Sequence, residues 1–262
     1  MNRTALRCVA LLALGMSACA SNAARAAATH APPAAQPKYP APATPLARDH
    51  DYFTRAPAVD FWALAPYYVG QQDDVSCSLA SLTMLVNAAR RGLSLDSEEP
   101  LVSQARLLEK VASDVWKRGL AAGGPGVTLE QLAVLARQSL AAYGMKPARV
   151  EDTHLAETTP AALEQLREVL RANENSGSDW LLFDFLAGTY LGTGDAGDYG
   201  HIAPVGAYDA ERQRVLVLDP DRQWYEPYWL PDDVALAGMA TRDPDSGQPR
   251  GYLYVSLPVP SP

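Results

Sequence analysis

Apolar side chains recur at helical spacing in four stretches of the chain, all before residue 180. The stretches are residues 78–92, 107–120, 128–144 and 159–177. Their apolar positions are mostly three or four residues apart, as on one face of a helix. Gly92 is a stop signal for the first, and Thr128 and Thr159 are expected N-caps of the last two. The pattern therefore predicts four helices.

The pattern then changes to short apolar runs separated by turn residues. These runs are residues 180–185, 200–208, 214–220 and 251–259. Runs of this length and composition are typical of β-strands. Helices that precede strands along a chain favour the α+β class. We therefore expect an N-terminal helical part followed by an antiparallel β-sheet part.

The first 19 residues predict an export signal rather than part of the fold. Two arginines precede a short apolar run and then small residues, which is the plan of such signals. Two endings remain open. The stretch "MSAC", residues 16–19, resembles a bacterial lipobox and would make Cys19 a lipidated first residue. The stretch "ARA", ending at Ala26, fits an ordinary signal peptidase instead. Either ending predicts an exported, periplasmic protein, attached to the membrane only through a lipid on Cys19.

Residues 20–48 are rich in alanine and proline and contain few large apolar side chains. Such a segment buries too little surface to offset the entropy lost on ordering, so we predict a disordered tether. Residues 49–262 are then expected to form one catalytic domain.

The net charge excludes one class of partner. The whole chain carries a net charge of −8, and five of its 22 basic but only one of its 30 acidic side chains lie in residues 1–50. Residues 51–262 therefore carry a net charge of −12. This balance argues against nucleic acid as a partner, because phosphates are bound by lysine and arginine.

Cys77 is the only cysteine after the N-terminal segment, which contains Cys8 and Cys19. It begins the first predicted helix, where partial positive charge and free amides stabilise a thiolate. Two interpretations are open: a buried small apolar residue, or a catalytic nucleophile.

A nucleophilic thiolate needs a histidine and a group that orients it. His201 begins a predicted strand, whereas the other histidines lie in the tether, at its end or in a polar connection. A hairpin loop of three or five residues centred on Ala210 would place His201 opposite Asp219; a four-residue loop would put them on opposite faces. Asp219 has a second interpretation as a strand-ending turn with Pro220.

The tetrahedral intermediate of acyl transfer also needs hydrogen-bond donors for its oxyanion. Gln71, six residues before Cys77, is the candidate side chain. The backbone amide of Cys77 is the candidate second donor.

The order Gln71, Cys77, His201 and Asp219 resembles the papain-like cysteine peptidases, and within them the phytochelatin synthases, including their short bacterial members. "QQDDVSCSLASLTMLVNA" resembles their nucleophile segment, and "GHIAPVGAYDAERQRVLVLDPDRQWYEPYWL" resembles their histidine and aspartate segment. The similarity covers roughly residues 60–235. After Cys77 the chain has no cysteine, so the cysteine-rich C-terminal extension of the plant members is not expected here.

The resemblance implies a papain-like fold and cleavage of glutathione at its Cys–Gly bond. Cys77 would be acylated by the γ-glutamylcysteinyl group with release of glycine, and water or a second glutathione would take the acyl group. No cofactor is required, although a thiophilic cadmium or zinc ion can enter on the glutathione thiolate. The expected substrate-binding residues are Arg222, Tyr225, Ser78 and Gly200. For Arg222, a surface ion pair is an equally good interpretation.

Several residues depart from the family pattern. Ser78 stands where the family has glycine, Ala187 where an arginine is expected, and residues 193–197 suggest an insertion. These departures concern the second-substrate site more than the acylation site, so hydrolysis is favoured over polymer synthesis. Two other hypotheses are a papain-like peptidase of the kind that trims double-glycine leaders and a non-catalytic, lipid-anchored binding module.

Overall fold

A computed structural model describes residues 38–39, 42–193 and 197–258. Cys8, Cys19 and both predicted ends of the export signal lie outside these residues. The described residues from Tyr39 onward belong to one compact unit. In the described part of the chain, no helix has the length and apolar character that crossing a membrane requires.

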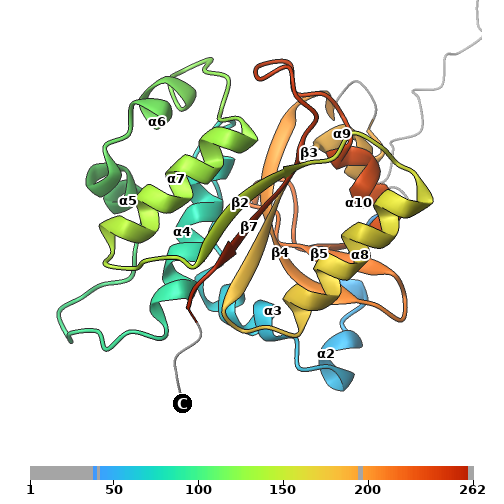
Figure 1. Cartoon of the computed structure of the whole chain (residues 1–262), viewed down its shortest axis with the longest axis horizontal. Helices are drawn as coiled ribbons and strands as arrows, with labels where there is room; N and C mark the ends of the chain where they lie inside the picture. Colours follow the sequence, from blue (N-terminus) through green and yellow to red (C-terminus); the bar gives the residue numbers. More distant parts are fainter. Residues whose placement is uncertain (1–37, 40–41, 194–196, 259–262) are drawn as a thin grey trace, which may run out of the picture. The chain divides into compact units, whose positions relative to one another are not determined.

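The helices and strands of this unit alternate more than the sequence pattern predicts (Figure 1). The strands are β1 Thr44–Pro45, β2 Arg149–His154, β3 Asp179–Leu186, β4 Gly200–Asp209, β5 Arg214–Val217, β6 Tyr228–Pro231 and β7 Gly251–Ser256. The α-helices are α2 Tyr52–Arg55, α3 Val59–Leu64, α4 Cys77–Arg90, α5 Gln104–Val111, α6 Asp114–Gly119, α7 Leu129–Ala142, α8 Pro160–Glu174, α9 Ala187–Leu191 and α10 Asp232–Met239.

The strands form one antiparallel sheet in the order β1-β6-β5-β4-β3-β7-β2. Alternate side chains of β3 enter two cores. Trp180 and Leu182 pack with α4 and α7, while Leu181 and Phe183 pack with α8 and α10 on the other face. The helices α4 to α7 gather on one side of the sheet in Figure 1, with α8 and α10 on the other. The predicted α+β class, with its antiparallel sheet, is confirmed.

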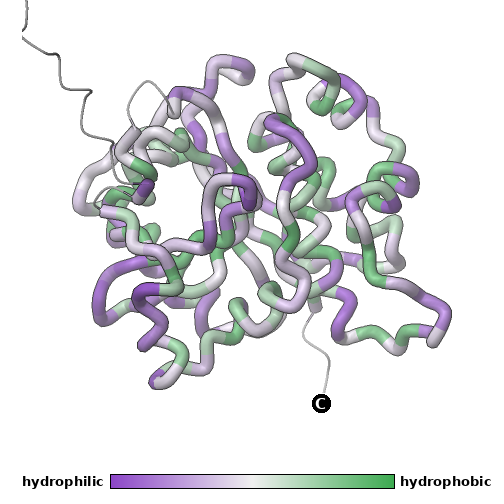
Figure 2. The backbone as a smooth tube through the Cα atoms, turned by 180° about the vertical axis from the view of Figure 1, so that it is seen from behind, coloured by the Kyte–Doolittle hydropathy of each residue, from purple (hydrophilic) through white to green (hydrophobic). Residues whose placement is uncertain are grey.

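Helix α4 is enclosed by the rest of the fold. Each of its residues is buried, which accounts for an apolar pattern that runs nearly all round the helix. The hydropathy colours of Figure 2 place the strongly hydrophilic residues mainly in connecting loops. The start of α4 is therefore held by packing along the whole helix.

Two predicted boundaries were wrong. The helix expected over residues 107–120 is broken at Ala112, which adopts a left-handed conformation (φ 47°), and Ser113 caps a new helix by accepting from the amide of Val115. The tether expected to end at residue 48 ends earlier, because Thr44 and Pro45 pair with β6. A strand of two residues is too short to show the alternation of apolar and polar side chains by which a strand is recognised in a sequence.

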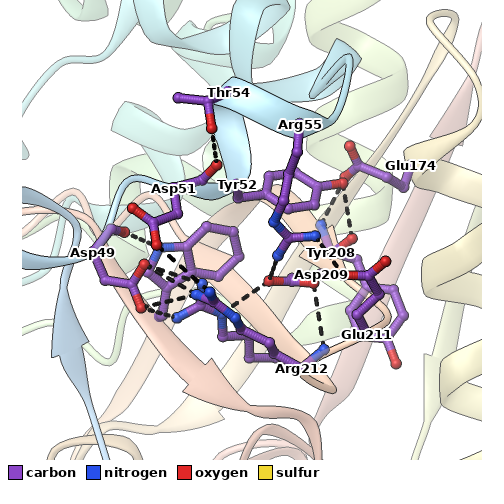
Figure 3. Close-up of polar contacts among 12 residues, drawn as sticks. Asp49, Asp51, Tyr52, Thr54, Arg55, Glu174, Tyr208, Asp209, Glu211 and Arg212 are labelled. Carbon is purple, nitrogen blue, oxygen red and sulfur yellow. Dashed lines mark hydrogen bonds and ion pairs between the residues drawn. The ribbon is translucent and has the colours of Figure 1, made fainter.

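Ion pairs hold the segment after β1 against the hairpin of β4 and β5 (Figure 3). Asp49 accepts from Arg212 and Arg214, and Arg55 pairs with Asp209. The side chain of Asp209 is 1% exposed, so its charge depends on these guanidinium groups. The network fixes the far end of the hairpin whose near end carries His201.

A buried carboxyl lies apart from this network. Asp60 on α3 is 1% exposed, and neither of its oxygens has a hydrogen-bond partner in the described part of the chain. Burial, followed by the charges of Glu174 and Asp179, raises the pKa of Asp60 well above 3.8.

We predict that Asp60→Asn reduces the loss of stability on going from acidic to neutral pH. Because the pKa of Asp60 is higher folded than unfolded, its stabilising contribution is present below 3.8 and is lost as the pH rises through the folded value. In that interval, each pH unit lowers the free energy of unfolding of the wild type by roughly 1.4 kcal/mol. The variant, which has no carboxyl group at this position, does not lose this free energy. Urea unfolding from pH 4 to pH 8 measures the difference, with exposed Asp233→Asn as the control. If the free energy of unfolding changed with pH in the same way in the wild type and in Asp60→Asn, the prediction would be contradicted.

Candidate active site

Cys77 is the first residue of α4, as the sequence predicts. The preceding loop is tied by Ser76, whose hydroxyl accepts from the amides of Gln72 and Asp73 at 2.9 and 3.0 Å. This closed turn brings the chain into α4 with the Cys77 side chain 8% exposed. The thiol lines two adjoining cavities, so it is buried yet reachable.

The structure brings His201 and Asp219 together. Nε2 of His201 lies 2.7 Å from Oδ1 of Asp219, and the two residues are 4% and 1% exposed. With Nε2 donating to the carboxylate, Nδ1 is the nitrogen left to exchange a proton with a neighbouring thiol. His201 and Cys77 line the same cavity.

The route to this contact differs from the expected one. The hairpin has a four-residue loop, because Asp209 pairs with Arg214, and such a loop alone would put His201 and Asp219 on opposite faces. A register shift between Val205 and Ala207 adds one residue to β4 and restores the same face. The extra residue is Gly206, where a Cβ would lie 2.9 Å from the side chain of Leu218.

The Asp219 carboxylate is fully engaged. Oδ1 also accepts from the amide of Asp221 at 2.9 Å, and Oδ2 accepts from the hydroxyl of Tyr228 at 2.9 Å. Burial alone would raise the pKa of Asp219, but the charge of His201 and these hydrogen bonds lower it below its usual value. The carboxylate therefore stays ionised and holds the imidazole in one orientation.

The imidazole of His201 is correspondingly basic. Burial acts to lower its pKa, but Asp219 outweighs burial, and with a further contribution from Cys77 the pKa of His201 is raised well above 6.5. The protonated imidazole beside Cys77 is a candidate general acid. The arrangement can carry out thiol acylation and proton transfer to a leaving group.

Gln71 is placed beside the nucleophile by backbone contacts. Its amide donates to the carbonyl of Pro220 at 2.7 Å, directly after Asp219, and Gln104 donates to the carbonyl of Gly70 at 2.8 Å. Gln71 and Cys77 line one cavity, and Oε1 of Gln71 is buried with no partner in the described residues. These backbone contacts hold Gln71 next to Cys77, so that both side chains line the same cavity.

One cavity next to Cys77 has a charged wall. This arginine cavity, of about 290 Å³, is lined by Cys77, Pro125, Gly126, Val127, Asp184, Leu186, Asp198, Tyr199, Gly200, His201, Ile202, Arg242, Asp243, Pro244, Asp245 and Arg250. Arg250 is 6% exposed; it donates to Asp184 at 3.0 Å and lies 3.7 Å from Asp243, while its Nε is buried without a partner in the described residues. Sequence reasoning missed this group, since a lone arginine before a C-terminal strand carries no local signal.

The second cavity is the aromatic groove, of about 660 Å³. It is lined by Gln71, Asp74, Val75, Cys77, Gly124, Pro125, Gly126, Tyr199, Gly200, Asp221, Trp224 and Tyr225. Since it shares Cys77 and Gly200 with the arginine cavity, the two spaces meet at the thiol.

The four expected substrate-binding residues have different positions. Gly200 lines both cavities and leaves room for Arg250, whose Nη1 would lie 2.5 Å from a Cβ there, and Tyr225 lines the aromatic groove. Ser78 is buried and accepts a hydrogen bond from Trp116 at 3.2 Å, so its side chain supports α4 rather than contacting substrate. Arg222 stacks over Tyr68 at 4.4 Å and lines neither cavity; no ion pair joins it to another described residue.

Comparison with known proteins bears on this geometry. A family model described as phytochelatin synthase matches residues 48–252. The chain belongs to the phytochelatin synthase family. It is 30% identical over 196 residues to glutathione gamma-glutamylcysteinyltransferase 3 of Lotus japonicus, and 26% identical over 198 residues to enzyme 1 of Arabidopsis thaliana. These alignments cover 75% and 76% of this chain but 37% of each relative, so the chain spans well under half their length.

A solved structure is also similar. Xylellain, a cysteine protease from Xylella fastidiosa, is 12% identical, with a TM-score of 0.43 over 74% of this chain and 84% of that one. This similarity is too low to add to the comparison. The expected phytochelatin synthase membership is confirmed by the family match.

We predict that Asp219→Asn slows alkylation of Cys77 by iodoacetamide at pH 6 by roughly tenfold or more, because the imidazolium loses its buried counter-charge. Peptide mapping by mass spectrometry separates Cys77 from Cys8 and Cys19. Tyr228→Phe, which removes one hydrogen bond but keeps the carboxylate, should have a smaller effect. Equal alkylation rates in the wild type and Asp219→Asn would show that His201 does not depend on this contact.

Proposed function

We propose that this protein cleaves glutathione at the Cys–Gly bond through a γ-glutamylcysteinyl thioester on Cys77. The observation that carries the proposal is the buried His201–Asp219 contact beside a cysteine at a helix start, within a region that matches the phytochelatin synthase family. The names of the plant relatives point to the same γ-glutamylcysteinyl transfer.

The arginine cavity suits the γ-glutamyl end of glutathione. That end carries an α-carboxylate and an α-ammonium, and the cavity offers both signs of charge. Arg250 lines the cavity and offers its guanidinium group to a carboxylate, and Asp243 lies beside it for an ammonium. Binding there places the cysteinyl carbonyl at the opening where Cys77 lies.

Each step then has a group to perform it. The Cys77 thiolate attacks the cysteinyl carbonyl, and the backbone amide of Cys77 with the side chain of Gln71 stabilises the oxyanion. His201 gives its proton to the departing glycine amine, and Asp219 keeps the ring oriented. In the second half, His201 takes a proton from water, which attacks the thioester and releases γ-glutamylcysteine. A second glutathione in place of water would give a phytochelatin.

Metal ions and location complete the proposal. In the described residues, no group of three or more His, Cys, Asp or Glu side chains could hold a metal ion. We propose that cadmium or zinc takes part only as a thiolate complex of the substrate.

The export-like N-terminus supports a periplasmic location, with a lipid on Cys19 or cleavage near Ala26. Mass spectrometry of the mature N-terminus distinguishes the two endings.

The purified protein should release glycine and γ-glutamylcysteine from glutathione, and Cys77→Ser should reduce the rate by at least roughly a thousandfold while leaving the folded domain intact. Product masses and circular dichroism make the two measurements. A Cys77→Ser protein that releases glycine at the wild-type rate would refute the proposal.

A second prediction concerns pH. Burial, against the pull of Arg250, raises the pKa of Asp184 to about 7. Above that pH the ionised Asp184 competes with substrate for Arg250, so KM for glutathione should rise between pH 6 and pH 8, by roughly tenfold if a charge-assisted hydrogen bond is lost. Asp184→Asn should flatten this dependence with little change in the pH profile of kcat. An unchanged KM profile in the variant would contradict the assignment of Arg250.

A further inference from the structure

In the proposed acyl-enzyme, the aromatic groove is the remaining route from solvent to Cys77. If the γ-glutamylcysteinyl group occupies the arginine cavity, the thioester carbonyl faces the other space that Cys77 lines. The departing amine and the incoming acceptor must then pass through the aromatic groove. Its lining therefore selects the acceptor.

The charge of the groove opposes an anionic acceptor. Asp74 and Asp221 line it, no lysine or arginine does, and neither carboxylate forms an ion pair with another described residue. Burial raises the pKa of Asp221, and the charges of Asp219 and Asp74 raise it further, against the charge of His201. Arg222, next to Asp221 in the sequence, stacks over Tyr68 and does not line the groove.

The aromatic side chains add a second reason. Trp224 is 56% exposed and Tyr199 is 42% exposed, and both line the groove together with Tyr225. Exposed rings next to carboxylates form favourable surroundings for an ammonium group, through ring faces and opposite charge together. Glutathione as an acceptor must react through its single amine, and its two carboxylates would then lie in a groove that already carries negative charge.

We infer that the aromatic groove binds an aliphatic diamine as acyl acceptor in preference to a second glutathione. This inference rests on the proposed function and names the acceptor for its second half-reaction. One end of the diamine stays charged between Asp74, Asp221 and the rings. The other end reacts at the thioester.

The transfer balances without any further reactant. The neutral amine nitrogen attacks the thioester carbonyl, a C–N bond forms and the C–S bond to Cys77 breaks. His201, left neutral when glycine departed, accepts the proton of the attacking nitrogen, and Cys77 leaves as a thiolate beside the protonated ring. The product is the amide of γ-glutamylcysteine with the diamine, and the enzyme regains its starting state.

Three amines of equal chain length isolate the distal charge. The protein is incubated with glutathione and either 1,4-diaminobutane, butylamine or 4-aminobutanoate, whose far ends are positive, neutral and negative. Mass spectrometry gives the ratio of amide product to γ-glutamylcysteine. We expect this ratio to be roughly three- to tenfold higher for the diamine than for butylamine, which is the effect of one or two partly exposed ion pairs. The ratio should be lowest for 4-aminobutanoate.

The double variant Asp74→Asn, Asp221→Asn should bring the three ratios close together. Glu168→Gln, which removes one exposed charge on α8 outside both cavities, should keep the wild-type order. Equal ratios in the wild type, amide formation with none of the amines, or transfer to a second glutathione in preference to the diamine would each overturn the inference.

A binding measurement separates this inference from the proposed function. If no glycine is released from glutathione, the proposed function fails, but the groove is still tested by alkylation of Cys77. We expect 1,4-diaminobutane to slow alkylation at a lower concentration than butylamine does, and the double variant to lose the difference. Equal protection by the two amines would refute the groove as a cation site.

Discussion

The buried hydrogen bond between His201 and Asp219 is the contact on which the rest of the site depends. It joins a strand to the turn after its neighbour and removes two ionisable groups from water, so it is stable only because every remaining acceptor is used. Tyr228 and the amide of Asp221 meet this need. The fold around them serves the same contact: ion pairs fix the far end of the hairpin, and the buried helix α4 holds Cys77 against its near end.

In the proposed reaction, the two cavities at Cys77 offer the two half-reactions different chemical surroundings. The arginine cavity is small and carries charges of both signs, while the aromatic groove is larger and carries only negative charge. An acyl group with a zwitterionic end fits the first, and an amine fits the second. The position of the thiol at their junction links the two halves of an acyl transfer.

The candidate residues Cys77, His201 and Asp219 could be selected from the sequence because their signals are local. A cysteine at a helix start, a histidine at a strand start and an aspartate at a strand end can each be found from a few neighbours, and the structure brings them together. The pairing register of β4 and β5 could not be predicted, because the bulge at Gly206 compensates for a hairpin loop of unexpected length. Arg250 and Asp184 were missed for a related reason: their contact joins β7 to β3, 66 residues apart, and no pattern within either segment indicates it.

The most direct test of the account is to trap the acyl-enzyme. The protein is mixed with glutathione, quenched in acid after a short time, digested and mapped by mass spectrometry. The account predicts a γ-glutamylcysteinyl group on the peptide that contains Cys77, together with free glycine. Intact glutathione and an unmodified Cys77 peptide, from a protein whose Cys77 is readily alkylated, would contradict it.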